Sequence, residues 1–112
     1  LAIFKDTKII KQQTWSSTLF SLNCKETLST GEKADIMNRF KAAIEALPAT
    51  ILYRDIHVGL NENPAEVWDI CLDSSFDTLD DVKAYAIHPA HVAAAGILKD
   101  AKENRACVDY TI

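Results

Sequence analysis

The order in which two kinds of hydrophobic repeat follow one another is the feature that most constrains the fold. Alternation of apolar and polar residues is typical of strands, and apolar residues that recur every three or four positions are typical of helices. The expected strands are residues 15–24, 51–59, 67–76 and 105–112, and the expected helices are residues 29–47, 78–88 and 89–102. This order predicts an α+β fold, the ferredoxin-like sandwich, in which a four-stranded antiparallel sheet carries its helices on one face.

The start of the first helix is marked by a capping box. Ser29 and Glu32 have the required spacing, in which each side chain accepts a hydrogen bond from the backbone amide of the other residue. Pro48 ends the helical pattern, because proline lacks an amide proton and clashes with the preceding turn. The apolar stripe of this helix is expected to lie on the sheet and comprises Ile36, Met37, Phe40, Ala43, Ile44 and Leu47.

The second helical region is expected to be broken at Pro89. Thr78 or Asp77 can cap its first half, in which Leu79, Val82 and Ala86 are expected to point inward. A proline disfavours the helical conformation of the residue before it but suits the first turn of a new helix. A kink at His88 and Pro89 is therefore predicted.

One face of the predicted sheet has no layer to cover it. The helices account for the other face, and 112 residues leave no third layer. An uncovered apolar surface of this size predicts contact with a second copy of the chain, that is, a homodimer through the open sheet face. The residues expected on this face are Leu19, Val67, Cys71, Val108, Tyr110 and Ile112.

The composition excludes several classes of function. The net charge of −4 argues against a nucleic-acid partner. No apolar run approaches the length needed to span a membrane, so a cytoplasmic protein is expected. Cys24, Cys71 and Cys107 lack the spacing of a zinc site or a disulfide framework, and they are interpreted as buried, reduced thiols. With three glycines and no phosphate-binding or dinucleotide motif, no cofactor is expected.

The chain is expected to divide into an N-terminal arm, residues 1–14, and one domain, residues 15–112. The arm alternates apolar and basic residues and opens on Leu rather than Met. Two interpretations of the arm stay open, a segment that is foreign to the native domain and an extra edge strand.

Residues 85–91 hold the strongest candidates for chemistry. His88 and His91 could ligate a metal, but two ligands are too few, and no metal site is expected. His88 is interpreted as a helix cap at the proline break. His91 and Tyr85 could act together across the kink, with the imidazole as acid or base and the phenol as a hydrogen-bond donor to a carbonyl oxygen. The alternative is a structural pair, in which His91 is satisfied by Asp109 and Tyr85 is an ordinary core residue.

The same stretch resembles the stress-responsive dimeric α/β-barrel family, often called Dabb. The resemblance covers residues 15–112 and is most specific at Tyr85-x-x-His88-Pro89-x-His91 and Val108-Asp109-Tyr110, with Trp68-Asp69 as a further match. It implies a homodimeric barrel. In the plant polyketide cyclases of this family, the matching histidine and tyrosine carry catalysis and the aspartate of the last strand orients the histidine. These roles fall on His91, Tyr85 and Asp109.

The chain departs from the family pattern at one position. The first strand of the family often carries a histidine, where this chain has Thr18. The expected ligand pocket lies between the sheet and the helices and comprises Thr18, Phe20, Leu22, Ile36, Phe40, Leu72, Ile87 and His88.

The sequence therefore leaves three alternative hypotheses for the function. The first is a homodimeric stress-response barrel protein that binds a small aromatic or polyketide-like molecule without catalysis. The second is a cofactor-independent cyclase or lyase that uses His91 and Tyr85 as an acid/base pair. The third, by looser analogy with other dimeric barrels, is a cofactor-free monooxygenase.

Overall fold

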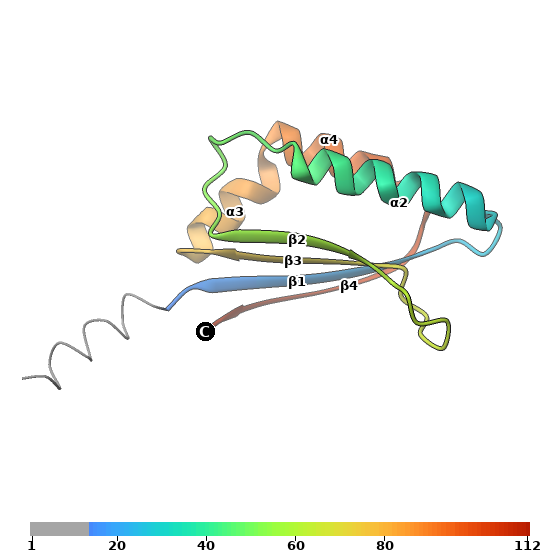
Figure 1. The fold of residues 1–112 in the computed structure, drawn as a ribbon. Coiled ribbons are helices and arrows are strands. Elements are labelled where there is room, and N and C mark those ends of the chain that lie inside the picture. The colour runs from blue at the N-terminus through green and yellow to red at the C-terminus, as the bar shows by residue number, and fades with distance from the viewer. Residues whose placement is uncertain (1–13) are drawn as a thin grey trace, which may run out of the picture.

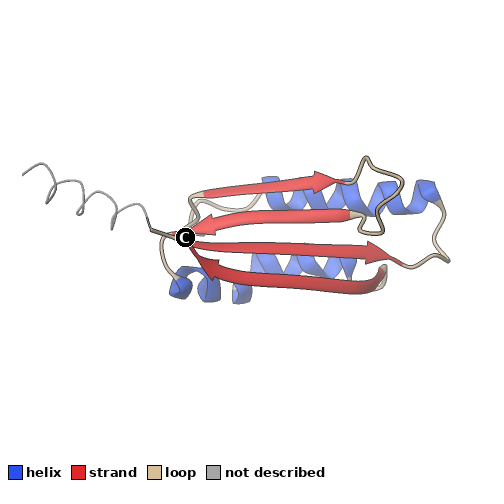
Figure 2. Ribbon diagram, turned by 90° about the horizontal axis from the view of Figure 1, so that it is seen from below, coloured by secondary structure: helices blue, strands red, loops and turns tan. Residues whose placement is uncertain are grey.

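A computed structural model describes residues 14–112 and confirms the predicted ferredoxin-like fold. All four strands pair antiparallel, in the spatial order β2-β3-β1-β4 (Figure 2). The strands are β1 (Ser16–Cys24), β2 (Asp55–Leu60), β3 (Ile70–Phe76) and β4 (Lys102–Thr111). The predicted arm falls almost entirely outside the described residues, so both interpretations of it stay predictions.

The helices cover one face of the sheet and leave the other face bare (Figures 1 and 2). They are α2 (Thr30–Glu45), α3 (Leu79–Ile87) and α4 (Pro89–Leu98). The capping box of α2 is present as predicted, and Thr78 caps α3 by accepting a hydrogen bond from the amide of Asp81 at 3.1 Å. The predicted kink is also confirmed, since α3 ends at Ile87 and α4 begins at Pro89.

Several boundaries differ from the predicted ones. Strand β2 begins at Asp55 rather than at residue 51, because Ile51 turns back on Pro48 and is buried against Phe76 instead of entering the sheet. Strand β3 begins at Ile70, so Val67 lies in the preceding loop and not on the open sheet face. Helix α4 ends at Leu98, where tight turns lead directly into β4 at Lys102.

The core lies between the sheet and the helices. Leu22, Phe40, Ile44 and Ile70 are almost completely buried there, as the apolar stripe and the strand alternation predict. Of the three residues of α3 predicted to point inward, Val82 is buried, Ala86 lines the cavity described below although it is exposed, and Leu79 is exposed, so the prediction is wrong for Leu79. Tyr85 is buried with Val82, because residues three apart share a helix face.

The capping box yields a first prediction. Replacing Ser29 by alanine removes the side chain that accepts from the Glu32 amide at 3.1 Å, and should lower the free energy of unfolding by about 1 kcal/mol. Urea unfolding at constant protein concentration measures the change, and Ser29→Asn, which keeps a capping acceptor, should recover most of the loss. Equal midpoints for wild type and Ser29→Ala would show that this cap contributes nothing.

Candidate functional site

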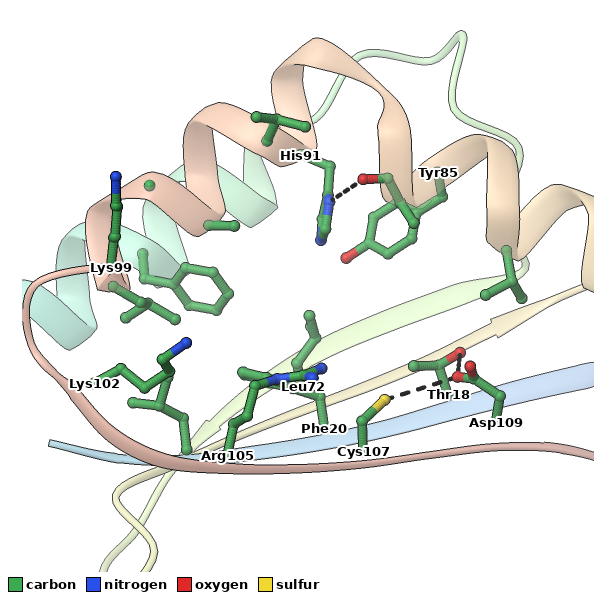
Figure 3. Close-up of a pocket in the computed structure, with 18 residues that line it drawn as sticks. Thr18, Phe20, Leu72, Tyr85, His91, Lys99, Lys102, Arg105, Cys107 and Asp109 are labelled. Carbon is green, nitrogen blue, oxygen red and sulfur yellow. Dashed lines mark hydrogen bonds between the residues drawn. The ribbon is translucent and has the colours of Figure 1, made fainter.

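A cavity of about 560 Å³ lies between the sheet and helices α3 and α4 (Figure 3). Its floor comes from residues of β1, β3 and β4 that face the helices, and its roof comes from α3 and α4. The cavity brings together all three predicted catalytic candidates, Tyr85, His91 and Asp109. Of the predicted pocket residues, those that line it are Thr18, Phe20, Leu22, Phe40 and Leu72.

Three predicted pocket residues lie elsewhere. Ile87 is 79% exposed at the end of α3, because the helix turns the opposite side toward the sheet. Ile36 packs against the core and does not line the cavity. His88 caps α4, where its Nδ1 accepts a hydrogen bond from the amide of Ala90 at 3.1 Å. The structure thus supports the interpretation of His88 as a helix cap.

Tyr85 is a buried phenol whose oxygen has no partner among the described residues. The residue is 5% exposed and its ring lies against Phe76, with 5.1 Å between the ring centroids. The hydroxyl oxygen is buried and makes no hydrogen bond within residues 14–112. Burial, with a smaller contribution from Cys107, raises the pKa of Tyr85, so the phenol keeps its proton at neutral pH and can only donate or accept as a neutral group.

His91 projects into the cavity beside Tyr85 (Figure 3). The centroids of the two rings are 4.2 Å apart. The Nδ1 atom of His91 lies 3.1 Å from the carbonyl oxygen of Ala86, which can only accept a hydrogen bond. Nδ1 therefore carries the proton in the neutral ring, and Nε2 is left with a free lone pair. Burial lowers the pKa of His91, which favours this neutral form.

The predicted hydrogen bond between His91 and Asp109 is wrong. Asp109 lies on β4, on the far side of the cavity, where it accepts a hydrogen bond from the hydroxyl of Thr18 at 2.8 Å. The two residues are neighbours across the β1–β4 pair, so the bond follows from the strand register. The orientation of the His91 ring comes from the backbone of α3 instead. Thr18, which stands where the family often has histidine, is thus engaged with Asp109.

Several cavity residues were not predicted from the sequence. Alternation along β4 places Arg105 on the same side as Cys107 and Asp109, and this signal could have identified it. The prediction that all three cysteines are buried is confirmed for Cys24 but wrong for Cys107, which is exposed at the cavity, and Cys71 is only half-buried. The other cavity residues that the predicted pocket did not include come from α3, from α4, from the turn that leads into β4 and from the first residue of β4. They are Val82, Ala86, Val92, Ala95, Gly96, Leu98, Lys99 and Lys102.

A second prediction concerns the unpartnered phenol. Tyr85→Phe removes a buried hydroxyl that gains no protein hydrogen bond, so the variant should be as stable as the wild type or more stable by about 1 kcal/mol. Urea unfolding of Tyr85→Phe, with Tyr53→Phe as a half-exposed control, measures the difference. A loss of stability comparable to that of an ordinary buried hydrogen bond would show that the hydroxyl is satisfied in the folded protein.

Fold and site together define an α+β ferredoxin-like domain with a small-molecule-sized cavity between its sheet and its helices. The family model described as Stress responsive A/B Barrel Domain matches residues 19–112. The chain therefore belongs to this family, as the resemblance predicted.

The proteins to which the chain is similar differ in their described activities. A dimeric ferredoxin-like protein of unknown function from Bacteroides fragilis is 52% identical, with a TM-score of 0.85 over 88% of this chain and 96% of that one. Olivetolic acid cyclase from Cannabis sativa is 23% identical over 83% of this chain and 92% of its own length. A hydroxynitrile lyase from Passiflora edulis is 16% identical, with a TM-score of 0.65 over 88% and 93% of the two chains.

The described residues hold neither a candidate membrane span nor a metal-binding cluster. Within residues 14–112, no helix combines the length and the apolar character that crossing a membrane requires. In the same part of the chain, no three histidine, cysteine or acidic residues lie close enough together to hold a metal ion. The cytoplasmic location stays a prediction.

Proposed function

We propose that the protein binds a small, largely apolar molecule in the cavity between the sheet and helices α3 and α4. The observation that carries this proposal is the buried Tyr85 hydroxyl, which lies in the cavity wall without a protein partner beside the free Nε2 of His91. Buried polar groups are nearly always hydrogen-bonded, so an unpaired hydroxyl in a cavity wall is a position where a bound molecule can supply the missing partner.

The chemistry of the cavity wall defines the ligand class. Apolar side chains, among them Phe20, Phe40 and Leu72, supply most of the contact surface. A few polar groups in an apolar cavity fix the orientation of a ligand. The protonated phenol of Tyr85 can donate to a ligand oxygen, and Nε2 of His91 can accept from a hydroxyl. A carbonyl or hydroxyl compound with an aromatic or aliphatic body meets these requirements.

We further infer that the protein acts as a homodimer through its open sheet face. The related Bacteroides fragilis protein is described as dimeric. In this chain the open face presents four exposed apolar side chains, Leu19, Val108, Tyr110 and Ile112, which are 42–58% exposed. Contact with a second copy would remove this apolar surface from water.

The binding proposal is tested by filling the cavity from Gly96. This glycine lies on α4 in the cavity wall, and a Cβ atom there would meet no atom within 4 Å. Gly96→Phe should therefore occupy the cavity without a clash at the backbone. Binding of N-phenyl-1-naphthylamine, a neutral apolar fluorophore, should weaken at least tenfold in this variant, an estimate based on the loss of a few contacts.

Gly96→Ala is the matched control, because it makes the same change to the backbone but adds only one methyl group. It should retain binding and gain up to about 1 kcal/mol of stability, since glycine is a poor residue inside a helix. If the fluorophore does not bind the wild type, or binds all three proteins equally, the proposed ligand site is wrong.

Proton transfer on the bound molecule is a second candidate function. It is favoured by the arrangement of a neutral His91 with a free Nε2 next to a protonated Tyr85. Such a pair can remove a proton next to a carbonyl group while the phenol stabilises the charge on the oxygen. The cyclase and the lyase among the relatives give the proposal a precedent. No residue of the described chain specifically favours the monooxygenase function, which stays a prediction.

A further inference from the structure

One end of the cavity is cationic, although the whole chain carries a net charge of −4. Lys99 follows the end of α4, and Lys102 and Arg105 lie at the start of β4. All three line the cavity, and all three are exposed, so this end of the cavity meets solvent. Figure 3 shows Lys99 and Lys102 at one end, Arg105 extending from that end along the floor toward Phe20, and Asp109 at the other end.

The three cations have no acidic partners in the described part of the chain. The ion pairs found there involve Arg39, Lys41, Arg54 and His57. The guanidinium of Arg105 instead lies over the ring of Phe20, 5.4 Å from its centroid. Arg105 therefore stands where the apolar floor of the cavity meets its solvent-exposed end.

The only acidic residue that lines the cavity among the described residues is Asp109. Its carboxylate accepts a hydrogen bond from Thr18 at the opposite end. The cavity therefore has a positive end, an apolar middle and a polar end that holds Tyr85 and His91. A ligand that matches this order has an anionic group at one end and an apolar body.

We propose that the natural ligand is an apolar carboxylate, with its body between Phe20, Phe40 and Leu72 and its carboxylate on Arg105 and Lys102. This inference deepens the proposed binding function and depends on it. Arginine pairs with carboxylates in a two-pronged geometry, and charge-assisted hydrogen bonds of this kind are about twice as strong as neutral ones. The unpaired cations at the cavity end thus select the charge of the ligand, and the apolar wall selects its body.

The experiment compares two ligands that differ in charge but hardly in shape. Octanoate and octanamide each compete with N-phenyl-1-naphthylamine for the wild-type protein, and the fluorescence gives a competition constant for each. Octanoate should bind about tenfold more tightly than octanamide at low salt, since one charge-assisted pair supports a difference of that order. The preference should shrink as the salt concentration rises, because the cations are exposed.

The double variant Arg105→Gln/Lys102→Gln should abolish the preference for octanoate, because neither glutamine carries the charge that distinguishes octanoate from octanamide. The matched control is Arg39→Gln/Lys83→Gln, which removes one arginine and one lysine, both exposed, outside the cavity. This control should keep the full preference.

The outcomes separate the two proposals. If the fluorophore binds but octanoate and octanamide compete equally well, the carboxylate proposal is overturned and the binding function stands. The carboxylate proposal also fails if the preference survives in Arg105→Gln/Lys102→Gln or is insensitive to salt. If the fluorophore fails to bind the wild type, the proposed binding function itself is overturned, and the carboxylate proposal falls with it.

Discussion

Val108→Asp should convert the protein into a monomer or unfold it. Val108 pairs with Leu19 across β1 and β4 on the open sheet face, and its side chain is 58% exposed in the single chain. In a homodimer through this face, an aspartate there would be buried without a cationic partner. Burying an unpaired carboxylate costs several kcal/mol, which is enough to dissociate a dimer at micromolar concentration.

Light scattering coupled to size-exclusion chromatography measures the effect. Ile87→Asp is the matched control, because it introduces the same charge at a residue that is 79% exposed at the end of α3. This control should remain dimeric. A wild-type protein that is already monomeric at micromolar concentration would contradict the dimer, and a dimeric Val108→Asp protein would place the interface elsewhere.

His91→Ala should remove proton-transfer activity if the second candidate function is correct. Phenylpyruvate is a suitable probe, since it has an aromatic body, a carboxylate and exchangeable protons next to a carbonyl group. Nε2 of His91 would take one of these protons, Tyr85 would donate a hydrogen bond to the carbonyl oxygen, and a deuteron from the solvent would return to the carbon. Loss of the base should lower the enzyme-dependent exchange rate by about 10²–10⁴-fold.

Proton NMR in heavy water follows this exchange directly. The pH profile carries a second test: His91 must be neutral to act as a base, and its pKa is lowered from 6.5 by burial. Exchange should therefore persist at slightly acid pH and decline only as the pH falls through the lowered pKa. His88→Asn keeps a capping acceptor at the kink and should retain activity. A wild-type protein that does not accelerate the exchange would contradict proton transfer on this class of substrate.

The fold could be predicted from the sequence because its signals are local and redundant. Alternation gave the faces of β1 and β3, the Ser29 capping box gave the start of α2, and Pro89 gave the kink. The boundaries that were wrong depend on tertiary contacts. Ile51, for example, lies at the start of a segment whose residues suit a strand, but it is buried against Phe76 instead.

The site could be predicted only in part, for a similar reason. The stretch from Tyr85 to His91 was identified by its unusual composition, and the structure brings both side chains to one cavity. The partner of His91 was missed, because a backbone carbonyl carries no signature in the amino-acid sequence. The orientation of α3 was predicted only in part: Val82 and Tyr85 face inward as expected, but its short apolar pattern fits more than one face, and only packing shows that Leu79 and Ile87 are exposed.

The hydrogen bond from His91 to the carbonyl oxygen of Ala86 has an evolutionary consequence. In many active sites the imidazole is held by a carboxylate, which a single substitution can remove. Here the acceptor is supplied by the peptide chain, so any residue can stand at position 86 as long as the break between the two helices is kept. Substitutions can therefore accumulate in the cavity floor, at Asp109 included, without a change in the orientation or the tautomer of this imidazole.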